Sequence, residues 1–121
     1  SEDFRLNRDK VVEIILKLRN SKLAGVFDSY DFFAESKENI DSILDMMLMF
    51  YRDLLIVKKT GNENILINSD KKDIILKNAD RFDMGKLIEN IEVIEEARRN
   101  IKQNANFQLV IEVMLMKLQE E

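Results

Sequence analysis

IDSILDMMLMFYRDLLIVKK, residues 40–59, is the most strongly patterned stretch of the 121-residue chain. On a helix of about 100° per residue, its apolar side chains fill one continuous arc of roughly 200°. In angular order, the arc consists of Met46, Val57, Phe50, Ile43, Leu54, Met47, Ile40, Tyr51, Leu44, Leu55 and Leu48. A surface helix needs an apolar stripe only about half as wide. The pattern therefore predicts a central helix with neighbours on several sides.

The flanking sequence predicts five further helices around this one, by apolar spacing and by residues that favour helix ends. We expect them over residues 7–19, 22–34, 68–78, 84–103 and 106–119. Gly61 is placed to end the central helix, and residues 65–67 read as a short extended segment. The candidate N-caps are Ser36, Asp83, and Asn104 or Asn106. We therefore expect residues 1–121 to form one compact all-α domain, a bundle of about six helices.

Composition argues against most catalytic and nucleic-acid-binding classes. The chain has no histidine and no cysteine, so the commonest general base and the thiolate metal sites are excluded. A row of acids on one predicted helix, Glu89, Glu92, Glu95 and Glu96, reads as a solvated face, because carboxylate-bridged metal bundles use Glu-x-x-His pairs. The net charge is −4, with basic residues interleaved among acids, so we expect no tight binding to DNA. The central stretch is too short and too charged at its ends to cross a membrane.

Two segments of the second half resemble a known family. They are FYRDLLIVKKTGNENILINSD, residues 50–70, and LIENIEVIEEARRNIKQNANFQLVIEVMLMKL, residues 87–118. They contain the steps Arg52-Asp53-Leu54-Leu55 and Glu96-Ala97-Arg98, and the tail Asn104-x-Asn106-x-x-Leu109-x-x-Glu112. In this order and spacing they resemble the C-terminal domains of the bacterial DNA polymerase III delta-prime family. The resemblance covers the chain from about residue 40 onward, and the earlier residues agree in helical character and position.

The resemblance implies a part of the clamp loader, which opens the sliding clamp and places it on primed DNA. In that family an ATPase-like module of two subdomains precedes a helical domain, and five such helical domains pack into a ring, the collar. The chain would be a non-catalytic collar domain, and the ATPase-like modules of its parent protein would lie outside it. Its partners would be the gamma/tau and delta subunits in the cytoplasm, with no cofactor and no small-molecule substrate. Because gamma/tau and delta have collar domains too, the chain could also belong to one of them.

Two helices carry apolar residues beyond what one core needs. Met49 and Ile56 lie seven residues apart, outside the apolar arc of the central helix, and the last helix is apolar nearly all round. An exposed apolar patch of this kind marks either a partner surface or a liability of the isolated domain. The predicted contacts with other subunits are Met49, Ile56, Met114, Met116 and Leu118. The alternative is a helical regulatory domain that binds a ligand or peptide, with residues 46–50 lining its pocket.

Arg98 lies on the apolar face of its predicted helix, where a charge needs a partner. The turn to the last helix is centred near Ala105, and Arg98 and Glu112 lie equally far from it on either side. Residues at equal distances from the turn of an antiparallel hairpin tend to lie opposite each other. We therefore predict an Arg98–Glu112 ion pair, with Asp53 as a substitute or third partner. Alternatively, Arg98 extends its stem over the core to reach water.

Overall fold

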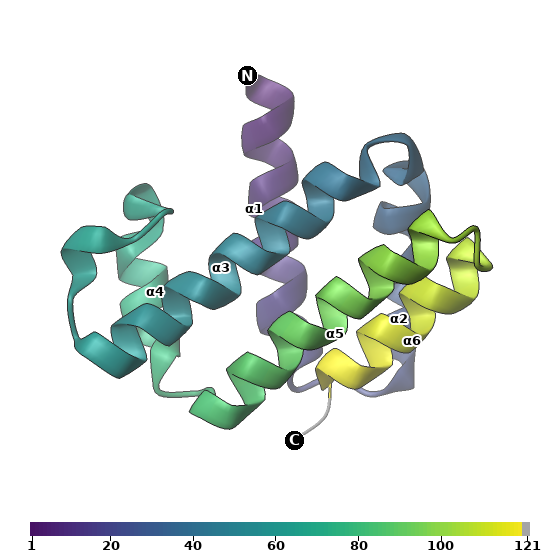
Figure 1. Ribbon diagram of the computed structural model, residues 1–121. Helices are drawn as coiled ribbons and strands as arrows, with labels where there is room; N and C mark the ends of the chain where they lie inside the picture. Colours follow the sequence, from purple (N-terminus) through teal and green to yellow (C-terminus); the bar gives the residue numbers. More distant parts are fainter. Residues whose placement is uncertain (120–121) are drawn as a thin grey trace.

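The computed structural model describes residues 1–119, which form an all-α bundle without strands (Figure 1). Its helices are α1 (Glu2–Leu18), α2 (Leu23–Glu35), α3 (Ile40–Thr60), α4 (Lys72–Ala79), α5 (Met84–Lys102) and α6 (Phe107–Gln119). Three short 3-10 turns join them: η1 (Lys37–Asn39), η2 (Glu63–Ile65) and η3 (Ser69–Lys71). The predicted fold class is therefore confirmed.

Helix α3 is the central element, as its wide apolar arc predicted. It packs against α1, α4 and α5, while α6 packs against α5, α2 and α1. Figure 1 shows α1 crossing steeply behind α3, with α5 lying alongside α3 and α6 alongside α5. The whole predicted arc is buried except Leu55 and Val57, which are half-buried and pack against the core. The core of the domain is thus built around this one helix.

The first helix starts earlier than predicted. It begins at Glu2 rather than Asn7, because the Ser1 hydroxyl accepts a hydrogen bond from the Phe4 backbone N–H at 3.2 Å. Glu2 and Asp3 in the first turn also suit the positive end of the helix dipole. Phe4 lies exposed on this first turn.

The start of α3 differs from the prediction, whereas its end agrees. Ser36 does not cap α3, because its hydroxyl donates to the Phe32 carbonyl at 2.8 Å and so ends α2. The turn η1 separates it from the first residue of α3. At the other end, Gly61 stops the helix in the left-handed conformation with φ of 68°. A residue without Cβ adopts this conformation at little steric cost.

The segment between α3 and α4 is only partly extended. Ile65 belongs to η2, and Leu66 is extended and buried. Ile67 is exposed, and so is Ile74 on α4. Of Ile74 and its neighbour Ile75, only Ile75 is buried, because α4 offers α3 a single narrow face.

The caps near α5 and α6 can be assigned individually. Asp83 occupies the N-cap position of α5, but its side chain makes no capping hydrogen bond. Asn104 is not an N-cap: with φ of 62° it follows the C-cap Gln103 and ends α5, where its backbone N–H donates to the Ile101 carbonyl at 3.0 Å. Asn106 caps α6, since its side-chain oxygen accepts from the Leu109 backbone N–H at 2.9 Å.

Candidate assembly surfaces

The five residues predicted for contacts with other subunits divide into core and surface. Met114 and Leu118 are 2% and 3% exposed, so their assignment to an open interface is wrong. They turn inward because α6 is packed by α5, α2 and α1. Met49 and Met116 are 38% and 40% exposed, and Ile56 is half-buried. Met49, Ile56 and Met116 therefore remain available to a partner.

A groove of about 430 Å³ runs between α5 and α6. Its lining residues are Val93, Glu96, Ala97, Asn100, Ala105, Leu109, Val110, Val113, Met114 and Lys117. Leu109 is 59% exposed, and Leu109, Val113 and Met116 share one face of α6 by their helical spacing. The many apolar residues of α6 predicted an exposed apolar surface, but the periodicity could not show which of them are exposed.

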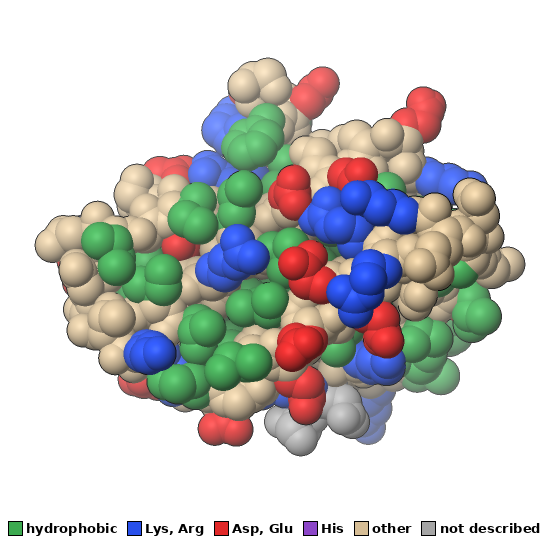
Figure 2. All heavy atoms as spheres, in the orientation of Figure 1, with side chains coloured by type: hydrophobic (Ala, Val, Ile, Leu, Met, Phe, Trp, Pro, Cys, Tyr) green, Lys and Arg blue, Asp and Glu red, His purple; other side chains and the backbone are tan. Residues whose placement is uncertain are grey.

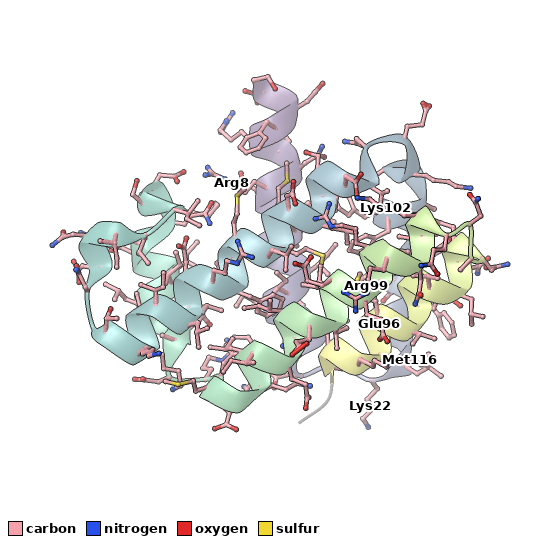
Figure 3. The ribbon with its side chains drawn as sticks, in the orientation of Figure 1. Arg8, Lys22, Glu96, Arg99, Lys102 and Met116 are labelled. Carbon is pink, nitrogen blue, oxygen red and sulfur yellow. The ribbon has the colours of Figure 1, made fainter. Side chains whose placement is uncertain are left out.

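The rim of the α5–α6 groove carries charge from both helices. Glu96 on α5 and Lys117 on α6 form an ion pair, with Oε1 and Nζ 3.3 Å apart and both side chains half exposed. Figure 3 shows Glu96 and Met116 on the neighbouring helices α5 and α6. An ion pair this exposed stabilises the fold by at most about 1 kcal/mol. It can therefore separate at little cost when a partner approaches.

A second hollow, of about 420 Å³, lies between α3 and α5. Its lining residues are Leu55, Ile88, Ile91, Glu92, Glu95 and Arg99. Met49 and Ile56 lie on α3, where Arg52 shares their outward side by helical spacing. Figure 2 shows hydrophobic side chains gathered over the end of α3 and the start of α5, with mixed charges over the opposite end of α5. The α3–α5 hollow, together with the neighbouring Met49 and Ile56, is a surface separate from the α5–α6 groove.

Arg98 makes its ion pairs across α3 and α5, so the predicted Arg98–Glu112 pair is wrong. Its guanidinium contacts Asp41, with Nη1 and Oδ1 2.9 Å apart, and also Asp45. The stripe of α5 that faces α3 contains Leu87, Ile94 and, one turn further, Arg98. Equal distance from the turn sets the level of a residue along the hairpin, but not the side of the helix from which it projects. Glu112 instead accepts a hydrogen bond from Gln108.

Asp53 is fully buried and takes no part in that network. Its carboxylate accepts hydrogen bonds from the backbone N–H groups of Ile67 and Asn68, both at 2.7 Å, and from the Asn68 side-chain amide at 2.9 Å. Its predicted role as a partner of Arg98 is therefore wrong. Three donors satisfy the buried charge and tie the loop after α3 to α3 itself.

Tyr51 and Asn90 form a buried polar site between α3 and α5. Burial raises the pKa of the Tyr51 hydroxyl above its ordinary value. Both side-chain polar atoms of Asn90 are buried without a hydrogen-bond partner among residues 1–119. Sequence periodicity did not identify this site, because both residues fall on the buried faces of their helices.

Four of the five residues of the alternative ligand pocket lie in the core, and the fifth, Met49, lies on the surface. Met46, Met47, Leu48 and Phe50 are each at most 5% exposed, and none of them lines either hollow described above. Within residues 1–119 no cluster of three or more His, Cys, Asp or Glu side chains could hold a metal ion. None of the helices in that range is long and apolar enough to span a membrane.

Comparison with known proteins places these surfaces in context. The chain matches the family described as "DNA polymerase III, delta subunit, C terminal" over residues 7–120. It is 29% identical over 123 residues to "DNA polymerase III subunit delta'" of Bacillus subtilis (strain 168). That alignment covers 99% of this chain and 37% of the relative, so the chain spans little more than a third of the relative's length. No solved structure matches the chain significantly.

Proposed function

Because the chain belongs to the family of C-terminal domains of the DNA polymerase III delta subunit, we propose that it is the assembly domain of a clamp-loader protein. In this proposal it packs in a collar with the corresponding domains of the gamma/tau and delta subunits. The parent protein resembles delta-prime and supplies its ATPase-like modules from outside this chain. The domain itself binds protein in the cytoplasm, and it binds no cofactor and catalyses no reaction.

The observation that supports an assembly role best is the open apolar stripe of α6 beside the α5–α6 groove. Leu109 and Met116 are 59% and 40% exposed on a helix whose opposite face is buried. Exposed apolar groups bordered by polar residues such as Glu96 and Lys117 are typical of protein–protein contacts. A charged residue substituted into this stripe should therefore weaken assembly.

Two separate surfaces suit a domain that sits in a ring. A closed ring of similar domains uses heterologous contacts, so each domain offers one surface to one neighbour and a different surface to the other. The α5–α6 groove with Met116 supplies one candidate, and the α3–α5 hollow with Met49 and Ile56 supplies the other. We assign these two surfaces to the two neighbours of the domain.

The assignment can be tested with single substitutions in the full-length parent protein. Met116→Lys and Met49→Lys change residues of matched exposure, 40% and 38%, on the two surfaces. We expect each to reduce co-purification with the other loader subunits at least fivefold, with unchanged circular dichroism. Leu76→Lys, at 38% exposed on α4, is the control and should assemble normally. Normal assembly of both methionine variants would show that these surfaces are not the contacts.

A further inference from the structure

Residues 62–79, which we call the strap, form most of the connection between α3 and α5. They comprise η2, η3 and α4. Figure 1 shows this segment at the edge of the molecule, beyond the C-terminal end of α3. Within residues 1–119, its helix α4 packs mainly against α3 and does not pack extensively against α2, α5 or α6. The strap is therefore attached to the bundle along one side.

The apolar attachment of the strap is small. Leu66, Ile75 and Ala79 are its buried apolar residues. Its exposed apolar residues are Ile65, Ile67, Ile74 and Leu76, each at least 37% exposed. More of its large apolar side chains thus face water than the core. Segments with few buried apolar contacts open at a lower free energy than the core.

Polar contacts supply much of the remaining attachment. The buried carboxylate of Asp53 holds the backbone N–H groups of Ile67 and Asn68, both at 2.7 Å. Within residues 1–119 no lysine or arginine forms an ion pair with Asp53, so the strap's own donors stabilise its charge. Undocking of the strap would leave this carboxylate without its partners until water replaced them.

Two ion pairs fasten the same part of the strap to α1. Arg8 contacts Asp70, with Nη1 and Oδ1 3.0 Å apart, and Lys71 contacts Asp9, with Nζ and Oδ1 2.6 Å apart. The Arg8 and Lys71 side chains are only 17% and 13% exposed, so their stems lie against the protein. The strap thus bridges α1 and α3 through its η3 turn.

We propose that the strap is a conformational latch that opens as one unit while the other five helices stay folded. The hydrogen bonds of Asp53 hold the closed strap against α3, and the two ion pairs hold it against α1. Opening would release α1 from its tether to the strap without breaking the apolar core of α3, α5 and α6. The latch would thereby control how firmly the first helix is held against the central one.

Native-state hydrogen exchange of the full chain tests the latch. In the unmodified protein the backbone amides of residues 67–79 should exchange at least tenfold faster than buried amides of α3 and α5. Their exchange should also depend less on added denaturant, as expected for a local opening. Asp53→Asn removes the charge and turns an amide toward the strap's donors. It should accelerate the strap amides a further tenfold and leave those of α5 and α6 within twofold.

Asp45→Asn is the matched control, because Asp45 lies on α3 but contacts Arg98 instead of the strap. It should leave strap exchange unchanged. Should Asp53→Asn fail to fold, Asp70→Asn on the surface is expected to accelerate the strap amides selectively by a smaller factor. Equal rates and equal denaturant dependence for strap and core amides in the unmodified protein would overturn the proposal. An equal acceleration of all amides by Asp53→Asn would also overturn it.

Discussion

The guanidinium of Arg98 shows what a single charged residue contributes at a helix junction. Its side chain is 18% exposed, whereas Asp41 and Asp45 are 60% and 54% exposed. The stem of Arg98 therefore covers part of the core, while its charge meets carboxylates that water already solvates. Because the acids are solvated, removing the cation leaves no buried charge unpaired, and the cost stays in the range of surface pairs.

We expect Arg98→Met to lower the free energy of unfolding by about 1 kcal/mol, since methionine keeps part of the stem but loses the ion pairs. Glu112→Gln should change it by less than about 0.5 kcal/mol, because within residues 1–119 the Glu112 side chain makes one hydrogen bond, to Gln108 at the surface. Urea titrations followed by circular dichroism measure both values. A larger loss from Glu112→Gln than from Arg98→Met would contradict the assigned partners.

Tyr51 links stability to alkaline pH. Burial raises the pKa of its hydroxyl in the folded protein, whereas in the unfolded chain it ionises near 10. The unfolded chain therefore loses this proton first, so the stability from Tyr51 is complete below pH 10 and falls as pH rises above it. From pH 9 to 11 the loss amounts to about 1.4 kcal/mol for one such group. We expect Tyr51→Phe to lose about that much less over this range in urea titrations. Parallel pH profiles for the two proteins would show that Tyr51 ionises freely in the fold.

At the scale of helices, the sequence was sufficient to predict that six helices form and that α3 is central. The 200° apolar arc of α3 is a property of one helix, so periodicity could reveal it. Helix ends were less predictable because local contacts decide them. Ser36 was free to cap α3 by its residue type, but its hydroxyl found the Phe32 carbonyl one turn back.

The orientation of surplus apolar residues could not be predicted from the sequence. Helix α6 is apolar on several faces, and neighbours distant in the chain decide which face is covered. Packing by α2 and α5 buries Met114 and Leu118 and leaves Leu109 and Met116 open. The pairing of Arg98 failed for the same reason, since it depends on α3, which lies more than fifty residues earlier.

Two glycines at the ends of helices provide a matched test of backbone conformation. Gly61 has a φ of 68°, and Gly85 lies inside the first turn of α5; a Cβ added at either residue would meet no atom within 4 Å. The two substitutions therefore differ mainly in backbone strain. Gly61→Ala should cost about 1 kcal/mol, because a Cβ disfavours the left-handed conformation. Gly85→Ala should stabilise by about 0.5 kcal/mol, because alanine favours helix. Thermal melts that shift in the same direction for both variants would contradict this.

At the scale of the molecule, α5 connects the two candidate contact surfaces. The α5–α6 groove and the α3–α5 hollow use different sides of this helix. A partner bound at one surface would therefore contact the same helix that lines the other surface. In a ring, this arrangement would let each neighbour influence how the domain receives the next.

The charge of the whole molecule leads to a prediction about DNA. The net charge is −4, and several basic groups are already paired with acids, among them Arg8, Lys71, Arg98 and Lys117. Binding to DNA without sequence preference comes from cations that replace the counterions of phosphates. Because these cations are engaged and the surrounding field is negative, the isolated domain should bind primed DNA with a Kd of about 10⁻⁴ M or weaker near physiological salt.

Fluorescence anisotropy with labelled primed DNA, measured over a series of salt concentrations, tests this expectation. The double variant Glu92→Lys and Glu95→Lys serves as the positive control, because it adds cations beside Arg99 in the α3–α5 hollow. It should bind more tightly than the unmodified domain, with a steeper dependence on salt. Micromolar, strongly salt-dependent binding by the unmodified domain would instead mean that its basic side chains act together on phosphates. The α3–α5 hollow would then have to be reconsidered as a surface for nucleic acid, since Arg52 and Arg99 lie beside it with no ion-pair partner among residues 1–119.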